Sequence, residues 1–263
     1  MDSVIDRLRQ AGCVYAEDEA AVLVEAAGGD DLELERLVSV RVGGAPLEPL
    51  LGWVAFGGLR VAVGPGVFVP RVRTELLAEL GLARLGSDAV AAGSVVTDAV
   101  VVELCCGVAA VAAVLQRSGR IRELYAVDID PIAVGYARQN LSEPAVTLAG
   151  DLYEPMPARL RGRVDLILAN APYVPTDAIA LMPREARDHE PLAALDGGAD
   201  GADIQRRIIA AAPTWLRASG HLMIETGREQ STITATAMAD AGLVTEVVID
   251  DNREGTVVIG QQI

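Results

Sequence analysis

Residues 100–112 read VVVELCCGVAAVA, an apolar run that passes through an acid, two adjacent cysteines and one glycine into a series of small residues. The first part has the composition of a buried strand, and residues 109–119, AAVAAVLQRSG, have that of a helix. Two interpretations of the turn between them compete. The pair Cys105 and Cys106 indicates either a redox or metal site, or a glycine-rich cofactor loop whose glycines have been partly replaced.

Strands and helices continue to alternate after this turn. The alternation predicts a parallel sheet with right-handed crossovers, closed by an antiparallel pair of strands. We therefore expect an α/β fold with a mostly parallel, seven-stranded sheet. The further strands are expected at residues 123–129, 145–150, 164–170, 220–227, 245–250 and 256–263, and helices at 131–141 and 202–218, the second interrupted by Pro213.

The first 75 residues follow other patterns. Residues 4–40 carry apolar residues at helical spacing, interrupted by GGDD at 28–31, where Asp31 or a neighbour is a candidate helix cap. WVAF and LRVAV flank a Gly-Gly pair at 57–58, which predicts a hairpin with a two-residue turn. Thr74 is then a candidate N-cap for a helix that begins at Glu75. A small helical region and a hairpin are thus expected ahead of the sheet.

The composition excludes several classes of function. All 22 basic residues are arginine and the net charge is −15, so Schiff-base chemistry, a P-loop lysine and direct nucleic-acid binding are not expected. Three cysteines and two histidines are too few for a zinc site of ordinary spacing, and no metal is expected. No apolar run approaches membrane-spanning length, the first ten residues lack a signal-peptide core, and free thiols suit the cytoplasm.

Polar residues follow four consecutive predicted strands of the sheet. Because ligands of parallel sheets bind at the carboxyl ends of the strands, these are candidate site residues, although each alone is also a common cap or turn residue. Asp128 is a candidate for accepting both hydroxyls of an adenosine ribose, since Asp130 is available to cap the next helix. Asp151 and Leu152 are candidates for holding an adenine. The four positions are Glu103, Asp128, Asp151 and Asn170.

The sequence Asn170-Ala171-Pro172-Tyr173 is either a strand-ending turn or a site for a planar –NH2 group. In the second case the Asn170 side-chain oxygen and the Ala171 carbonyl oxygen each accept one N–H. Pro172 biases Ala171 toward extended geometry, and Tyr173 offers a flat surface. An amide nitrogen is a poor nucleophile, so its orientation against a cationic methyl donor is the main source of catalysis in this hypothesis.

At these motifs the chain resembles the HemK-type protein-(glutamine-N5) methyltransferases, S-adenosylmethionine enzymes that modify glutamine in release factors or a ribosomal protein. The Asn-x-Pro-Tyr motif also occurs in DNA and RNA amino-methyltransferases, whereas HEPLAALDGGADG is far more specific to the glutamine group. The resemblance covers about residues 50–263. Its matching pieces are LGWVAFGGLRVAVGPGVFVPRVRTE (51–75), VVELCCG, AVDIDPIAV, GDLYEPM, LANAPYV, REARDHEPLAALDGGADGADIQRRII (184–209) and GHLMIETGREQ.

The resemblance implies a class I methyltransferase, Rossmann-like fold. It divides the chain into a shortened helical substrate-docking domain (1–50), a hairpin linker (51–73) and a methyltransferase domain (74–263). It also implies S-adenosylmethionine as cofactor and a protein glutamine as substrate. The implied roles are Glu103, Leu104, Cys105, Cys106 and Gly107 around the methionine part of the cofactor, Asp128 at the ribose, Asp151 and Leu152 at the adenine, Phe68 beside the cofactor, and Asn170, Ala171, Pro172 and Tyr173 at the substrate glutamine, with Asn170 also next to the cofactor.

The chain departs from the family pattern at four positions. Cys105 and Ala109 replace the first and third glycines of the loop, and each adds a Cβ that must avoid positive φ or incur strain. Ala171 replaces a proline, which is compatible with a role for its backbone carbonyl. Arg73 stands where an acid is common and indicates a solvated residue or a different substrate.

Two other functions remain open at this point. One is methyl transfer to an exocyclic amine of nucleic acid or of a small molecule, although nine aromatic residues and the acidic balance disfavour nucleic acid. The other is a non-catalytic homologue that only binds the cofactor, which the altered glycine loop would explain. The metal or redox interpretation is disfavoured because the sequence offers no partner ligands.

Overall fold

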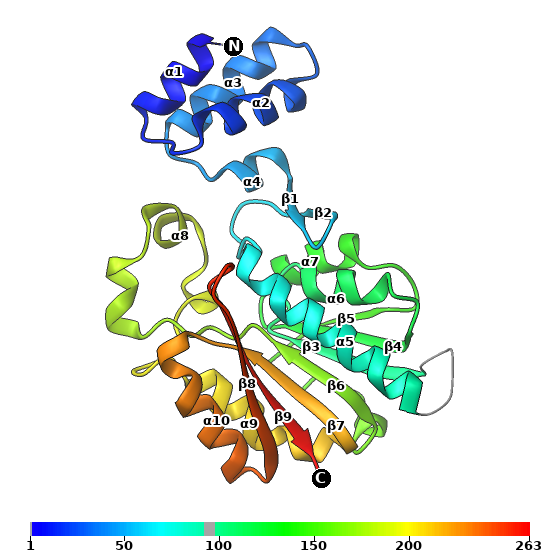
Figure 1. Ribbon diagram of the computed structural model, residues 1–263. Coiled ribbons are helices and arrows are strands. Elements are labelled where there is room, and N and C mark those ends of the chain that lie inside the picture. Colours follow the sequence, from blue (N-terminus) through cyan, green and yellow to red (C-terminus); the bar gives the residue numbers. More distant parts are fainter. Residues whose placement is uncertain (1, 92–97) are drawn as a thin grey trace.

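A seven-stranded sheet in the order β5-β4-β3-β6-β7-β9-β8 forms the centre of the computed structural model, which describes residues 2–91 and 98–263 (Figure 1). Strands β3 to β7 run parallel, and β9 is antiparallel to both β7 and β8. The predicted fold class, with its antiparallel C-terminal pair, is confirmed. The strands are β3 (Ala99–Leu104), β4 (Ile121–Asp128), β5 (Val146–Ala149), β6 (Val164–Ala169), β7 (Leu216–Glu225), β8 (Leu243–Asp250) and β9 (Gly255–Gln262).

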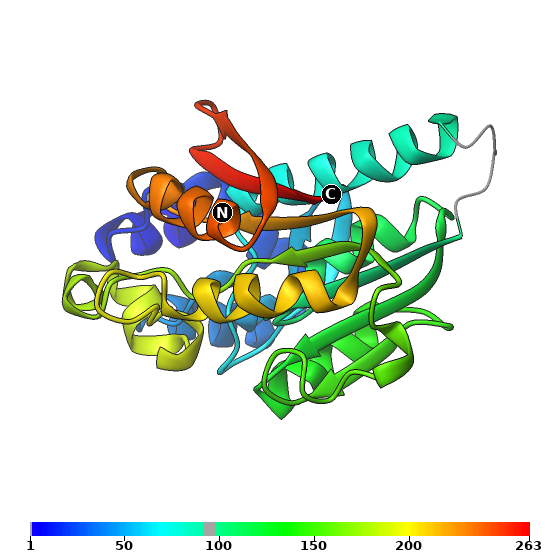
Figure 2. The ribbon, with the colours of Figure 1, turned by 90° about the horizontal axis from the view of Figure 1, so that it is seen from below.

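Helices cover both faces of this sheet because successive residues of its buried strands point to opposite sides. Val101 packs into one core with α5, α6 and α7, whereas Val102 packs into a second core with α9 and α10. Figure 2 shows α9 lying alongside β7, the strand that follows it. The helices are α5 (Glu75–Ala91), α6 (Ala110–Gln116), α7 (Pro131–Asn140), α9 (Asp203–Trp215) and α10 (Ser231–Asp240).

Two predicted helices differ from their expected extents. The helix expected over 109–119 ends at Gln116, and the one expected over 202–218 ends at Trp215, because Leu216 already pairs with Val164 of β6. Pro213 lies inside α9 without dividing it. Strand pairing therefore overrides helical propensity at the end of α9.

Three N-terminal helices form a small bundle with its own buried core, centred on Leu8, Leu23 and Val38. Figure 1 shows this bundle at one end of the molecule, beyond α4 and the hairpin. Asp30, the neighbour of Asp31, caps α3 through hydrogen bonds from Leu32 N and Glu33 N. The elements are α1 (Asp2–Gln10), α2 (Ala16–Ala27), α3 (Asp31–Val42), α4 (Leu47–Leu51), β1 (Trp53–Phe56) and β2 (Leu59–Ala62).

The predicted hairpin turn and the start of α5 are both present. Gly57 and Gly58 form the two-residue turn with φ of 54° and 74°, values that glycine adopts without strain. The Gly57 N–H donates to the Glu75 carboxylate at 2.8 Å, which ties the hairpin to α5. Helix α5 begins at Glu75 as predicted, after the short 3-10 turn η1 (Val72–Thr74).

An irregular segment between β6 and α9 lies beside the N-terminal bundle. It contains η3 (Thr176–Leu181), α8 (Arg184–His189) and η4 (Leu192–Ala194). The buried Arg41 guanidinium of α3 pairs with Glu19 of the bundle at 2.7 Å and with Glu185 of α8 at 2.5 Å. This ion-pair network links the bundle to the segment. Within the described ranges 2–91 and 98–263, none of the helices is long and apolar enough to cross a membrane.

Candidate active site

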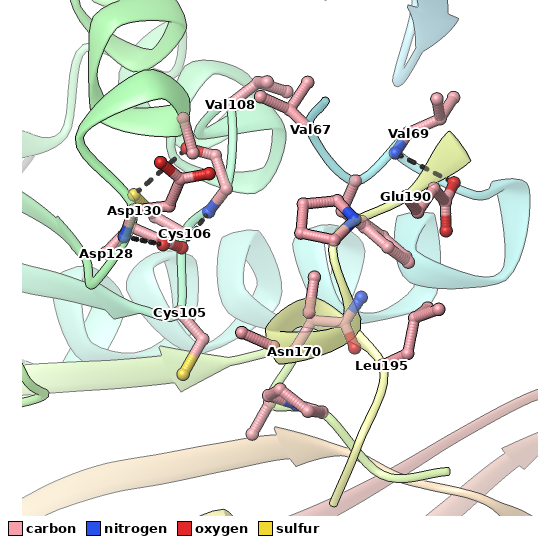
Figure 3. Close-up of a pocket in the computed structure, with 18 of the residues that line it drawn as sticks. Val67, Val69, Cys105, Cys106, Val108, Asp128, Asp130, Asn170, Glu190 and Leu195 are labelled. Carbon is pink, nitrogen blue, oxygen red and sulfur yellow. Dashed lines mark hydrogen bonds between the residues drawn. The ribbon is translucent and has the colours of Figure 1, made fainter. Parts of the chain in front are cut away.

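A cavity of about 1150 Å³ opens at the carboxyl ends of β3, β4 and β6 (Figure 3), where parallel sheets bind their ligands. It brings together almost every site residue that the sequence predicts. Leu104 is the exception, because its side chain is fully buried in the core shared with α9 and α10. The predicted residues that line the cavity are Phe68, Glu103, Cys105, Cys106, Gly107, Asp128, Asp151, Leu152, Asn170, Ala171, Pro172 and Tyr173.

The loop after β3 repeats one backbone conformation at every second residue. Cys105, Gly107 and Ala109 have φ of 51°, 53° and 60°, so all three lie in the left-handed region. Cys105 and Ala109 therefore do not avoid positive φ and incur the strain that a Cβ brings there. This strain costs about 1–2 kcal/mol per non-glycine residue, and the loop adopts the left-handed conformation at Cys105 and Ala109 although neither is glycine.

Gly107 faces open space on the side where a side chain would stand. A Cβ built at this position would meet no protein atom within 4 Å. Packing against the described residues therefore does not explain why this position is glycine. It leaves room for a ligand to approach the backbone of the loop closely.

Asp128 binds the backbone of this loop. One carboxylate oxygen accepts from Gly107 N at 2.7 Å, and the other accepts from Asp130 N at 2.9 Å. Asp130 in turn caps α7 by accepting from Ile132 N at 2.8 Å, as predicted. A carboxylate has about four acceptor positions, so Asp128 retains capacity for ligand hydroxyls while it holds the loop. Burial raises the pKa of Asp128.

Glu103 is an almost fully buried carboxyl under the same loop. It is 3% exposed and accepts from Ala112 N at 2.7 Å, in the first turn of α6. Burial raises the pKa of Glu103 to about 8, against the lowering effect of that hydrogen bond. A cationic ligand in the cavity would favour the ionised form of this group.

Burial also raises the pKa of the Cys105 and Cys106 thiols. Both are therefore protonated at neutral pH, and a thiol is a far weaker nucleophile and metal ligand than a thiolate. Over the residues that the structure describes, no group of three or more His, Cys, Asp or Glu side chains is arranged to hold a metal ion. The geometry favours the cofactor-loop interpretation of the cysteine pair.

Asp151 and Leu152 follow β5 at the edge of the cavity. An Asp151 carboxylate oxygen forms an ion pair with Arg207 of α9 at 2.6 Å, and Leu152 has a φ of 51°. Arg207 also lines the cavity, a contact that the sequence does not predict.

The segment Asn170–Tyr173 lies at the middle of the cavity and is held from several sides. The Asn170 Nδ2 donates to the Thr74 hydroxyl oxygen at 3.2 Å. The Tyr173 hydroxyl donates to the Glu225 carboxyl at 3.4 Å, and the Tyr173 carbonyl accepts from Gln230 Nε2 at 2.8 Å. Burial raises the pKa of Tyr173 to about 12, so its hydroxyl stays protonated at neutral pH.

The glycines of HEPLAALDGGADG allow close packing against this segment. A Cβ at Gly197 would come within 2.7 Å of the Pro172 carbonyl oxygen and 2.5 Å of the Gly201 carbonyl oxygen. Gly198 and Gly201 have φ of 89° and 77°, as expected for tight turns. Only glycine fits at position 197 without moving backbone, which accounts for this part of the motif.

Glu190 of the same motif is a buried carboxyl. It is not among the site residues predicted from the sequence. Its Oε1 accepts from Arg71 at 2.5 Å and from Val69 N at 3.3 Å, and the Arg71 guanidinium lies 5.2 Å from the centre of the Phe68 ring. Its Oε2 has no hydrogen-bond partner among the described residues. Burial raises the pKa of Glu190.

Figure 3 shows Asn170 between two groups of lining residues. We call them the loop half and the peptide half of the cavity. The loop half comprises Cys105, Cys106, Val108, Asp128 and Asp130, with Glu103 and Gly107 of the same turn. The peptide half comprises Val67, Val69, Glu190 and Leu195, with Arg71, which pairs with Glu190, and Phe68, which Arg71 contacts.

Thr74, Glu190, Arg207 and Glu225 are the site residues that sequence reasoning missed. Glu190 and Glu225 stand inside the motifs HEPLAALDGGADG and GHLMIETGREQ, which was the available signal. Sequence spacing does not indicate that Thr74 belongs to the site, because Thr74 and Asn170 are 96 positions apart and still share a hydrogen bond.

The known proteins that this chain resembles in sequence are methyltransferases. Residues 86–184 match the family model of the methyltransferase small domain. The chain is 40% identical over 223 residues to the release factor glutamine methyltransferase of Mycolicibacterium smegmatis, over 84% of this chain and 75% of the relative. It is 36% identical to that of Geobacter sulfurreducens, over 74% of this chain and 65% of the relative.

Solved structures share the fold at lower identity. A 16S rRNA N2 G1207 methyltransferase of T. thermophilus, in complex with AdoMet and guanosine, superposes with a TM-score of 0.57 at 19% identity, over 80% of this chain and 50% of that one. The ribosomal protein L11 methylase of Lactobacillus delbrueckii subsp. bulgaricus has a TM-score of 0.52 at 17% identity, over 73% and 81%. These neighbours place the sheet in the class I methyltransferase fold.

Proposed function

Because this chain belongs to the release factor glutamine methyltransferase family, we propose that it methylates the side-chain amide nitrogen (N5) of a glutamine in a peptide chain release factor, with S-adenosylmethionine as methyl donor. The observation that carries this proposal is that Asn170 and Ala171 line the same cavity as the loop residues 105–108. One cavity therefore has room for a methyl donor beside the groups that would hold an amide.

The residues of the loop half suit this cofactor. The open side of Gly107 allows close approach, and the carboxyls of Glu103 and Asp128, whose pKa values are raised by burial, would be stabilised in their ionised form by a cationic ligand. We assign the methionine part of S-adenosylmethionine to the loop Glu103–Gly107, the ribose to Asp128 and the adenine to Asp151 and Leu152. When bound, S-adenosylmethionine supplies an electrophilic methyl group on a sulfonium.

The residues at the middle of the cavity would hold the substrate amide. The Asn170 Oδ1 and the Ala171 carbonyl oxygen each accept one N–H of the glutamine side chain, which fixes the direction of the nitrogen lone pair. Pro172 restricts Ala171 to extended backbone, so that carbonyl needs no reorganisation. Orientation of this kind lowers the barrier by up to about 7–11 kcal/mol in favourable cases, which compensates for the poor nucleophilicity of an amide.

The peptide half and the N-terminal bundle would receive the release factor. We propose that residues 1–50 dock the substrate, that 51–73 link them to the methyltransferase domain at 74–263, and that the segment with α8 shapes the peptide entrance. The Arg41–Glu185 ion pair connects the bundle to that segment. The net charge of −15 favours a basic partner surface. The described cysteines are free thiols, which supports the expected cytoplasmic location.

Methyl transfer to a purified release factor tests the proposal. The protein is incubated with methyl-labelled S-adenosylmethionine and the release factor of its own source, and tryptic peptides are sequenced by mass spectrometry. We expect one methyl group on a glutamine side chain. Calorimetric titration with S-adenosylmethionine is run in parallel. Label in RNA or in small molecules instead would identify the alternative amine methyltransferase, and cofactor binding without any label would identify a non-catalytic homologue.

A further inference from the structure

A set of buried polar side chains stands directly behind Asn170. Thr74 is 3% exposed and Glu225 is 1% exposed. Asn170 Nδ2 donates to the Thr74 hydroxyl oxygen at 3.2 Å, and the Thr74 hydroxyl hydrogen-bonds to the Glu225 carboxyl. The Tyr173 hydroxyl donates to the same carboxyl at 3.4 Å. Three segments far apart in the sequence thus meet behind one amide.

The chemistry of these groups decides which of them donates and which accepts in the hydrogen bonds from Asn170 to Thr74 and from Thr74 to Glu225. An ionised carboxylate only accepts, so Glu225 takes the single O–H proton of Thr74. The Thr74 oxygen then has only lone pairs to offer, and it can bond an amide only through N–H. Asn170 must therefore present Nδ2 to Thr74, which leaves its Oδ1 on the other side of the amide group.

We propose that Thr74, supported by Glu225, is a positioning residue that keeps the Asn170 oxygen available to the N–H of the substrate amide. The inference rests on the proposed function and extends it to two residues that act through Asn170. If the Asn170 amide were flipped, its Nδ2 would face the substrate N–H, and two donors cannot bond each other. The flip would also turn Oδ1 toward the Thr74 oxygen, which has no proton left to give.

The environment of Glu225 fits this role. Burial raises the pKa of Glu225 to about 7, while hydrogen bonding from Thr74 and the charge of Arg73 act to lower it, as does the bond from Tyr173. Its Oε2 has no hydrogen-bond partner among the described residues. Below its pKa the protonated carboxyl becomes a donor to Thr74, and the direction of the hydrogen bonds is no longer fixed. Above its pKa the carboxylate only accepts, and Thr74 must donate to it.

Substitution of Thr74 tests the proposal in the intact protein. Thr74→Val keeps the shape and removes the hydroxyl, whereas Thr74→Ser keeps the hydroxyl. Thr234→Val is the matched control, because Thr234 is a buried threonine whose hydroxyl bonds another amide side chain, Gln205, at 2.6 Å in the core away from the cavity. All three are compared with wild type for kcat/KM with the release factor, S-adenosylmethionine Kd and Tm.

We expect Thr74→Val to lower kcat/KM about 10- to 100-fold, the cost of one lost orienting hydrogen bond, with the cofactor Kd changed less than about threefold. Thr74→Ser should recover most of that loss, and Thr234→Val should lower Tm without lowering kcat/KM. Wild-type kcat/KM in Thr74→Val would overturn the proposal. So would equal loss in Thr74→Ser and Thr74→Val accompanied by weaker cofactor binding, because that pattern belongs to a structural role.

A second measurement does not depend on turnover. In ¹⁵N-labelled protein at pH 8 the Asn170 side-chain NH2 should give a resolved, slowly exchanging proton pair with nuclear Overhauser effects to Thr74. Both features should be lost in Thr74→Val. A rapidly exchanging or averaged pair in wild type would refute the positioning role. If the pair is fixed but the wild type transfers no methyl group, the proposed function fails while the orientation of Asn170 stands.

Discussion

The two halves of the cavity are built in different ways. The loop half comes from residues that are close in the sequence, since Glu103, Gly107 and Ala112 are joined within one strand–turn–helix unit, and Asp128 follows the next strand. The peptide half and the neighbouring Asn170 are held by segments distant in the sequence, as in the pairs Arg71–Glu190 and Thr74–Asn170. Under the proposed assignment, a local backbone motif would hold the cofactor, while recognition of the amide would depend on the completed tertiary fold.

The halves also differ in their backbone strain and in their buried carboxyl groups. The loop half holds backbone strain at Cys105 and Ala109 together with the buried carboxyl of Glu103. The peptide half has no described non-glycine residue at positive φ. It contains the buried carboxyl of Glu190, and the buried carboxyl of Glu225 lies behind Asn170; each has one oxygen without a hydrogen-bond partner among the described residues. Changes in the first should act on cofactor affinity, and changes in the second on turnover. Three predictions use this separation.

The largest effect is expected from Asn170→Ala, which removes the amide oxygen at the middle of the cavity. Turnover with the release factor should fall by about a thousandfold or more, since a transition-state hydrogen bond and the orientation of the nucleophile are both lost. The S-adenosylmethionine Kd should stay within about tenfold of wild type. Steady-state kinetics and calorimetry measure the two. Unchanged turnover would refute the assigned role of Asn170.

An intermediate effect is expected from Gly107→Ala in the loop half. The new Cβ meets no protein atom within 4 Å, so the fold should survive with a loss of about 1–2 kcal/mol for an alanine at positive φ. The same Cβ would occupy the space assigned to the cofactor, and the Kd should rise about 10- to 100-fold. Gly119→Ala, at φ of 67° with equally open space, is the control for strain alone. Equal cofactor affinity in both variants would contradict the assignment of the loop.

The smallest effect is on stability as a function of pH. The folded-state pKa values of Glu103 and Glu225 are raised from 4.5 to about 8 and about 7. The contribution of each group to the free energy of unfolding is therefore fully present below pH 4.5. It is lost as pH rises through the folded-state pKa. Urea unfolding should show the free energy of unfolding decline between pH 5 and pH 8.5 by at least about 1.4 kcal/mol, the value of a single pKa unit.

Conservative variants divide that decline between the two carboxyls. Glu103→Gln should remove the part that extends to about pH 8, and Glu225→Gln the part that ends near pH 7. Asp177, an exposed acid outside both groups, serves as the control in Asp177→Asn. A decline that is the same in all four proteins would show that neither buried carboxyl causes it.

The sequence predicts most of the fold and most of the named residues that line the site. Strand–helix alternation predicts the parallel sheet, and the residues after each strand predict Asp128, Asp151 and Asn170, because the carboxyl ends of parallel strands must lie at one edge. Thr74 illustrates the limit. Its spacing predicts the start of α5 correctly, but its hydrogen bond with Asn170 arises only when η1 packs against the end of β6.

The sequence does not predict the positive φ of Cys105 and Ala109 either. Residue type favours negative φ at both positions, yet the loop takes the left-handed conformation because Gly107 N and Cys106 N are bound by Asp128 and by the Val127 carbonyl. Tertiary hydrogen bonds override local preference at this turn. Family resemblance, rather than propensity, was the information that identified it as a cofactor loop.

The decisive measurement is a crystal structure of the protein with S-adenosylhomocysteine and a release-factor peptide that contains the substrate glutamine. We expect S-adenosylhomocysteine against the loop Glu103–Gly107, and the glutamine amide nitrogen within hydrogen-bond distance of both Asn170 Oδ1 and the Ala171 carbonyl oxygen. A glutamine bound elsewhere, or an amide nitrogen that contacts neither of these oxygens, would contradict the proposed mechanism.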